Sequence, residues 1–136
     1  MIIGYTQGTY DMFHIGHLNL LQNARKQCDS LVVGVNSDEL VKTYKHKCAI
    51  VPLAERMAII QALRCVDQVI PCETLDKKVA LTQIHFNRLF IGDDWKGNAR
   101  WEATEQEMKL LGVEVVFLPY TQNTSSTLLR EKLSDY

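Results

Sequence analysis

Two histidines, His14 and His17, stand three residues apart with only Ile-Gly between them, in a segment at residues 8–17 that reads GTYDMFHIGH. Imidazoles donate hydrogen bonds, and a pair of them can stabilise the charge that builds up on phosphate oxygens during group transfer. Gly8 and Gly16 lie beside these side chains and let a ligand approach the backbone closely. This spacing therefore favours the binding and transfer of a phosphate group.

The segment follows an apolar run at residues 1–5 and precedes a helical pattern that begins at Leu18. We therefore expect the two histidines at a strand-to-helix junction, which is the usual ligand crevice of an α/β sheet. A helix N-terminus there adds free N–H groups and a positive dipole end, and both suit a phosphate. Asp11 within the junction can orient an imidazole or lie near a metal ion. The alternative is a capped helix with two surface histidines.

Strand-like and helix-like segments alternate along the rest of the chain, which predicts a parallel sheet with helices on both faces. The uninterrupted apolar run at residues 31–35 is typical of a strand buried on both faces. Right-handed crossovers place every strand-to-helix loop at one end of such a sheet, so the loops at 7–17, 92–101 and 119–126 should converge on one crevice. We expect a single Rossmann-like α/β domain over residues 1–136, with a doubly wound five-stranded sheet. The predicted strands are 2–6, 31–35, 68–70, 88–91 and 113–118, and the predicted helices are 16–27, a short one capped by Ser37, 53–63, 76–85, 102–111 and 125–133.

The composition excludes several classes of protein. With 136 residues, 46% apolar and 23% charged, the chain resembles a soluble globular domain. A net charge of −1 gives no strong basic field for nucleic acid or an anionic membrane. No apolar run approaches the roughly 20 residues that cross a bilayer, and no secretory leader opens the chain, which predicts a cytoplasmic protein. The four cysteines form no C-x-x-C pair, so we expect reduced thiols and no zinc site.

Three segments together resemble a known family. Residues 8–17 are similar to the H-x-G-H signature of the cytidylyltransferase-like nucleotidyltransferases. RCVDQVI at residues 64–70 resembles that family's R-Y-V-D-E-V-I segment, and GDDWKG at residues 92–97 resembles its G-D-D-W-x-G loop. The last loop is the most specific of the three, because adenylyltransferases and class I aminoacyl-tRNA synthetases share the H-x-G-H element. The resemblance spans nearly the whole chain and is closest to the bacterial glycerol-3-phosphate cytidylyltransferases.

The resemblance implies a reaction. The phosphate of a small phosphorylated alcohol, glycerol 3-phosphate above all, attacks the α-phosphorus of CTP, and pyrophosphate leaves; the CDP-glycerol formed serves cell-wall or capsule polymers. Such in-line transfer needs positioning and charge stabilisation more than covalent catalysis. Mg²⁺ is the expected cofactor, held largely through phosphates, and a homodimer is the expected assembly. The alternatives are an adenylyltransferase acting on a sugar phosphate or flavin phosphate, and a non-catalytic nucleotide sensor.

The resemblance also implies site residues. His14 and His17 would hold the triphosphate and stabilise the transition state, while Lys45 or Lys47 would reach the phosphates as a catalytic cation. The sequence does not decide between the two lysines. Besides the histidines, the expected nucleotide-binding residues are Thr9, Tyr10, Arg64, Gly92, Asp94, Thr121, Ser125, Ser126 and Thr127. Besides the lysines, the expected substrate-binding residues are Asp11, Arg56, Asp94, Trp95 and Tyr120.

A structural role is the alternative for several of these residues. Lys45 and Lys47 belong to a local basic cluster, and such runs are often only solvated. Arg64 and Asp67 can form an ordinary ion pair at a helix end, which contributes at most about 1 kcal/mol if exposed. Trp95 can be a partly buried apolar anchor.

The last predicted loop departs from the family pattern. Residues 120–127 correspond to the family's R-T-x-G-I-S-T-T, but Tyr120 replaces the arginine and Asn123 replaces the glycine. The hydroxyls of Ser125 and Ser126 remain at the predicted start of the closing helix, where free N–H groups can help to cradle phosphates. Tyrosine offers one hydroxyl donor and no charge. Either another cation has replaced the arginine, or the acceptor or the rate differs.

Overall fold

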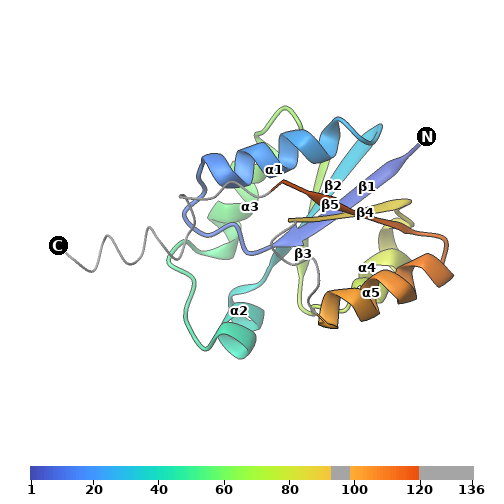
Figure 1. Cartoon of the computed structure of the whole chain (residues 1–136). Coiled ribbons are helices and arrows are strands. Elements are labelled where there is room, and N and C mark those ends of the chain that lie inside the picture. Colours follow the sequence, from blue (N-terminus) through green and yellow to red (C-terminus); the bar gives the residue numbers. More distant parts are fainter. Residues whose placement is uncertain (93–98, 120–136) are drawn as a thin grey trace.

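Five parallel strands form one sheet in the order β3-β2-β1-β4-β5 (Figure 1). The structure is a computed structural model and describes residues 1–92 and 99–119. The chain moves outward from β1 to β3 and then returns to the other side of β1, which confirms the predicted doubly wound α/β class. The strands are β1 (Ile3–Gly8), β2 (Ser30–Asn36), β3 (Gln68–Cys72), β4 (Arg88–Gly92) and β5 (Glu114–Leu118). The helices are α1 (Ile15–Arg25), α2 (Asp38–Lys45), α3 (Leu53–Gln61), α4 (Lys77–Ile84) and α5 (Ala99–Leu110).

The core lies in two layers, one on each face of the sheet. Helices α1 and α3 cover one face, and α4 and α5 cover the other (Figure 1). Successive side chains of β2 point to opposite faces: Leu31 and Val33 join the cluster under α1 and α3, while Val32 joins the cluster under α4 and α5. Each such buried side chain contributes about 1.5–3 kcal/mol. The apolar run at 31–35 is therefore buried on both faces, as predicted.

The described helices are short, from 8 to 12 residues, and their ends follow local chemistry. The Ser37 hydroxyl accepts a hydrogen bond from the Leu40 N–H at 3.1 Å, so the predicted cap of α2 is confirmed. Gly112 follows α5 with φ +82°, the left-handed backbone that favours glycine after a helix. None of these helices is long and apolar enough to cross a membrane. The predicted closing helix at 125–133 lies outside the described residues.

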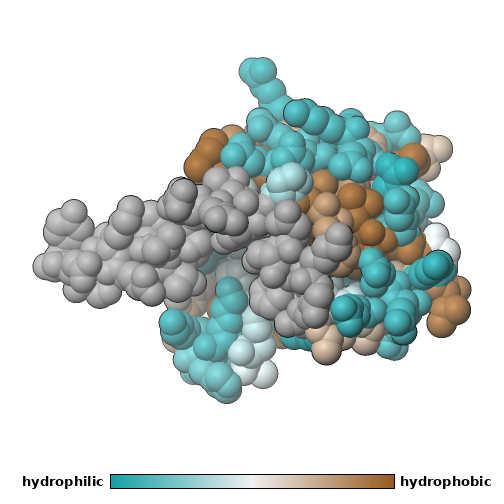
Figure 2. Space-filling view, in the orientation of Figure 1, coloured by the Kyte–Doolittle hydropathy of each residue, from teal (hydrophilic) through white to brown (hydrophobic). Residues whose placement is uncertain are grey.

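The surface in Figure 2 is largely hydrophilic over α1 and α5, with an apolar band between them where β5 runs along the edge of the sheet. All four cysteines are free thiols: Cys28 and Cys72 are buried, Cys65 is half-buried and Cys48 is exposed. This agrees with the expectation of reduced thiols.

Candidate functional site

The loop between β1 and α1 has an unusual backbone. Tyr10 and Met12 have φ of +54° and +49°, a left-handed conformation that is uncommon outside glycine. Such a conformation costs of order 1–3 kcal/mol and persists where surrounding contacts enforce it. The Tyr10 ring is buried against Gly8, where an added Cβ would lie 3.0 Å from the ring. Strain of this kind is typical of ligand-binding loops, and here it brings the chain back toward the start of α1.

His14 and His17 cap the start of α1 reciprocally. The Nδ1 of His14 accepts a hydrogen bond from the Gly16 N–H at 3.0 Å, and the Nδ1 of His17 accepts one from the His14 N–H at 3.3 Å. The two rings stack with their centroids 3.9 Å apart. Because each Nδ1 is an acceptor, the proton of each neutral ring lies on Nε2. Both rings therefore present an Nε2–H donor.

The surroundings keep both rings neutral. Burial lowers the pKa of His14. Burial lowers the pKa of His17 to about 3, and the charges of His14 and Lys45 act in the same direction, while Asp11 opposes them. Two charged rings at this separation would also repel each other. At neutral pH the pair therefore donates hydrogen bonds without contributing positive charge.

The Nε2 atom of His14 is buried and has no hydrogen-bond partner within the described ranges. A buried donor without an acceptor costs about 1–3 kcal/mol, so native structures seldom leave one. It lies at a helix N-terminus, where N–H groups and the helix dipole attract anions. An oxygen atom of an anionic ligand would satisfy it.

A cavity of about 160 Å³ opens beside this helix start, between the carboxyl ends of β1 and β4. Residues of the first and second predicted loops, 7–17 and 92–101, both line it, which confirms that these two loops converge. The third, at 119–126, lies almost entirely outside the described residues. The cavity is lined by Thr6, Gln7, Gly8, Thr9, Tyr10, His17, Leu20, Ile91, Gly92 and Trp101.

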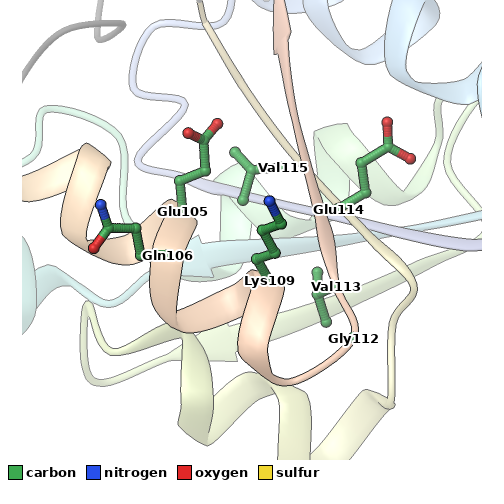
Figure 3. A pocket seen from close by; sticks show the side chains of 7 residues that line it. All are labelled: Glu105, Gln106, Lys109, Gly112, Val113, Glu114 and Val115. Carbon is green, nitrogen blue, oxygen red and sulfur yellow. The ribbon is translucent and has the colours of Figure 1, made fainter.

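A larger hollow of about 610 Å³ lies elsewhere, along α5 and the start of β5 (Figure 3). Its wall includes Glu105, Lys109 and Glu114, with apolar surface from Val113 and Val115. These residues lie toward the amino end of β5, whereas the histidines lie at the carboxyl end of β1. It presents two carboxylates and no imidazole, so we place the site at the smaller cavity.

The end of α2 brings one of the two candidate lysines close to the imidazoles. The charge of Lys45 is felt at His17, where it lowers the pKa. The Tyr44 hydroxyl lies 2.8 Å from the Thr9 hydroxyl and 3.2 Å from the Asn36 amide nitrogen, which fastens this last turn to the edge of the cavity. Lys47 is exposed beyond the end of the helix. Of the two lysines, the position of Lys45 therefore favours phosphate binding.

The guanidinium of Arg56, which is expected to bind substrate, instead forms hydrogen bonds to other parts of the protein. Its side chain is 1% exposed. Its Nη1 donates to the carbonyls of Thr9 and Asn36 at 2.7 and 2.8 Å, and its Nε donates to the carbonyl of Val51 at 2.8 Å. Its Nη2 pairs with Asp38 at 2.5 Å. The expectation is corrected: Arg56 joins the ends of β1 and β2 to α2 and α3.

Asp11 lies near the site but is likewise turned into the protein. Its carboxylate is buried and accepts hydrogen bonds from the N–H groups of Ile50 and Val51, each at 2.8 Å. Its negative charge opposes the lowering of the pKa of His17. Asp11 therefore anchors the loop before α3 and influences the pKa of His17, and its expected contact with substrate stays a prediction.

Arg64 lies far from the imidazoles within one chain. It is exposed between the end of α3 and the start of β3, at the amino end of the sheet. Asp67, its expected partner, instead pairs with the Nε of Arg25 at 3.1 Å and accepts a hydrogen bond from the Leu31 N–H at 2.7 Å. Arg64 therefore lies at the amino end of the sheet of its own chain, and its expected contact with the nucleotide stays a prediction.

The remaining expected site residues fall into two groups. Thr9, Tyr10 and Gly92 line the cavity, as their expected nucleotide contact requires. Asp94, Trp95, Tyr120, Thr121, Ser125, Ser126 and Thr127 lie outside the described residues.

Sequence reasoning missed Trp101, which lines the cavity, and Lys77, whose Nζ lies 5.2 Å from the centroid of the Trp101 ring. Trp101 stands at the end of the predicted 92–101 loop, and Lys77 begins α4 directly after a strand-to-helix loop. Their position at the carboxyl end of the sheet was the available signal, because side chains there face the crevice.

Comparisons with known proteins show the family of this chain. A family model described as "Cytidylyltransferase-like" matches residues 5–132. Glycerol-3-phosphate cytidylyltransferase from Bacillus subtilis (strain 168) is 33% identical over 130 residues, which cover 95% of each chain. Bifunctional protein HldE from Yersinia pestis (strain Pestoides F) is 34% identical over 131 residues, which cover 96% of this chain and 27% of that relative.

Solved structures show the same fold. The lipopolysaccharide core biosynthesis protein from Thermoplasma volcanium GSS1 superposes with a TM-score of 0.75 at 25% identity, covering 91% of this chain and 99% of that one. Pantothenate synthetase from Thermus thermophilus has a TM-score of 0.63 at 16% identity, covering 96% and 64%. The second likeness is one of fold alone.

Proposed function

This chain belongs to the cytidylyltransferase-like family and is a nucleotidyltransferase, and we propose that it transfers CMP from CTP to glycerol 3-phosphate, giving CDP-glycerol and pyrophosphate. Relatives with that activity in their names match it over nearly their full length. The observation that carries the proposal is the pair of stacked, neutral imidazoles at the start of α1, of which His17 lines the cavity and His14 has a buried Nε2 without a hydrogen-bond partner among the described residues. A role in making cell-wall or capsule polymers follows from the product.

The reaction needs no general base on the protein. A phosphate oxygen of glycerol 3-phosphate is already ionised near neutral pH, since the second pKa of a phosphate monoester is about 6. It forms a bond to the α-phosphorus of CTP as the bond to the bridging oxygen of the pyrophosphate breaks, and negative charge passes to the leaving group. The Nε2–H groups of His14 and His17 donate to phosphate oxygens that gain charge in this step. The N-terminus of α1 acts on the same oxygens.

Neutral imidazoles do not offset the charge of two anions, so cations must come from elsewhere. We assign Lys45 to the triphosphate, because its charge already reaches His17. The described residues include no group of three or more His, Cys, Asp or Glu that could hold a metal ion, and the carboxylate of Asp11 is bound to backbone amides. Mg²⁺ fits best as the complex with CTP, held through phosphate oxygens, where it neutralises part of their charge.

Pyrophosphate release tests the proposal. We expect release when the protein meets CTP, Mg²⁺ and glycerol 3-phosphate, with CDP-glycerol identified by mass. Parallel reactions with ATP and with sugar or flavin phosphates test the adenylyltransferase alternative. Binding of CTP without release from any small phosphate acceptor would instead identify a nucleotide sensor.

The homodimer and the cytoplasmic location remain predictions. Light scattering coupled to size exclusion measures the first. A monomer at assay concentration would contradict it, and the assignment of His14 and His17 would be unaffected, because both come from one chain.

A further inference from the structure

A buried amide side chain ends β2 beside the candidate site. Asn36 is 3% exposed and is not among the described residues that line the candidate cavity. Its Oδ1 accepts a hydrogen bond from the Nε2 of Gln7, in β1, at 2.8 Å. Its Nδ2 lies 3.2 Å from the hydroxyl of Tyr44, in α2, and 3.4 Å from the hydroxyl of Thr9, which does line the cavity. Asn36 can therefore influence a bound ligand only through these neighbours.

The surroundings of the Asn36 amide fix which of its ends donates. The Nε2 of Gln7 also donates to the carbonyl of Thr74 at 2.9 Å, and a carbonyl oxygen only accepts hydrogen bonds. The amide nitrogen of Gln7 is therefore the end that faces Asn36, and the Asn36 atom that it meets must be an acceptor, Oδ1. The Nδ2 of Asn36, with two N–H groups, is then directed at the two hydroxyls.

The hydroxyls of Thr9 and Tyr44 leave one proton for a ligand. They lie 2.8 Å apart, so one of them donates a hydrogen bond to the other. Both accept from the Nδ2 of Asn36, and neither donates to a third group in the hydrogen bonds of residues 1–92 and 99–119. Because each hydroxyl has a single proton, the proton of the second hydroxyl can go to a ligand oxygen. The Asn36 amide thereby makes this pair a hydrogen-bond donor at the edge of the cavity.

Tyr44 also supports the lysine that we assign to the triphosphate. The Nζ of Lys45 lies 5.7 Å from the centroid of the Tyr44 ring, a distance at which a cation is attracted to an aromatic face. The hydroxyl of the same ring is held by Asn36 and Thr9. The Asn36 amide therefore affects the position of both a hydroxyl donor and a cation.

Resting on the proposed function, we propose that Asn36 is a positioning residue for the nucleotide, which acts through the Thr9 and Tyr44 hydroxyls to direct a donor and Lys45 at the triphosphate of CTP. Ionised phosphate oxygens only accept hydrogen bonds, so the hydroxyl pair must donate outward. An amide at position 36 achieves this because its N–H groups fill the acceptor sites of both hydroxyls. A carboxylate of the same shape would instead accept from both hydroxyls, and no proton would be left for the ligand.

A double-mutant cycle between Asn36→Ala and Tyr44→Phe tests the proposal by steady-state kinetics. Asn36→Ala removes two hydrogen bonds to the hydroxyl pair and should raise the KM for CTP about tenfold. The kcat and the KM for glycerol 3-phosphate should stay within about twofold. If Asn36 acts through Tyr44, the double variant should match Asn36→Ala, at about tenfold, whereas independent effects would multiply to about 50-fold.

Two further variants separate positioning from a general weakening of the fold. Asn36→Asp keeps the size of the side chain but reverses the hydroxyl protons, so it should raise the KM for CTP at least as much as Asn36→Ala. Ser37→Ala is the matched control, because Ser37 is the next residue, is buried and caps the opposite end of α2 from Lys45. It should lower the Tm of the ligand-free protein and leave the KM for CTP within about twofold. CTP with Mg²⁺ should raise the Tm of the wild type and of Ser37→Ala more than that of either Asn36 variant.

Each contrary result has a defined meaning. A wild-type KM for CTP in Asn36→Asp would overturn the proposal, because the shape of the side chain alone would then be sufficient. Multiplying effects in the cycle, or an equal rise in Ser37→Ala, would overturn it as well. If CTP raises the Tm of the wild type but no CMP is transferred to any acceptor, the proposed function fails, and the Tm shifts of the variants still test Asn36. If CTP does not stabilise the wild type, both proposals fail.

Discussion

The substitution His14→Asn separates the two roles of His14. The imidazole caps α1 through Nδ1 and presents a donor through Nε2. Asparagine is among the best N-cap residues, so its side-chain oxygen can replace the acceptor at Nδ1, but it is too short to place a donor where Nε2 lies. Alanine at this position removes both.

The two variants should differ in stability and agree in activity. Loss of the cap in His14→Ala costs about 1 kcal/mol, which for a domain of this size lowers the Tm by about 3 °C. His14→Asn should melt within about 1 °C of the wild type on the same reasoning. Loss of one transition-state donor costs about 10²–10³ in kcat, and both variants should show that loss.

Pyrophosphate release at saturating CTP and acceptor, together with thermal melting, checks this expectation. If His14→Asn kept a rate within about threefold of the wild type, the Nε2 donor would have no part in the reaction and His14 would be only a cap. The substitutions His17→Ala and His17→Gln should each lower kcat by a similar factor of about 10²–10³. Near-normal rates in all four variants would refute the catalytic assignment.

Three further predictions follow from neighbouring contacts. Between pH 6.5 and about pH 3 the unfolded chain binds a proton at His17 that the folded chain does not, so stability falls as the pH falls through this window. Melts across that range should show a shallower fall for His17→Gln, and equal slopes would contradict the lowered pKa. Tyr44→Phe removes the hydroxyl that bonds α2 to the cavity edge. It should raise the KM for CTP about fivefold, which is the equivalent of one hydrogen bond of about 1 kcal/mol. An unchanged KM for CTP would show that the position of α2 does not affect nucleotide binding. Arg56→Met leaves two buried carbonyls without these donors, and at about 1–3 kcal/mol each it should lower the free energy of unfolding by about 2–6 kcal/mol in urea titrations. Normal stability together with a raised acceptor KM would instead support a substrate-binding role.

The hydrophobic periodicity of the sequence predicted most of the fold, and strand pairing explains why two strands are longer than predicted. β1 continues to Gly8 and β3 to Cys72, each two residues beyond the apolar run that predicted it. Gln7 remains in β1 because it pairs with Gly34 of β2, a contact that local sequence does not reveal. Pro71 lacks an N–H and would disrupt a central strand, but β3 is an edge strand with one neighbour.

The candidate site was predictable where function depends on local geometry. His14, Gly16 and His17 lie within one loop and one helix turn, so their spacing alone places both rings together. The role of Arg56 depends on the carbonyls of Thr9 and Asn36, which lie 47 and 20 residues away in the sequence. A charged residue in a sequence does not reveal which acceptors the fold will bring to it. The same holds for Arg64, which the direction of α3 carries to the opposite end of the sheet.

The neutrality of the two imidazoles explains why donors and cations come from different elements. Burial at the start of α1 strengthens the hydrogen bonds that the rings make, because the local dielectric constant is low, and the same burial prevents them from holding charge. Their backbone hydrogen bonds fix both rings rigidly, as transition-state stabilisation requires. Charge is then left to cations such as Lys45 at the end of α2, whose long side chain can adapt to a bound anion. On this view, the α1 donors determine the transfer step, and the segment after β2 contributes to holding the phosphates.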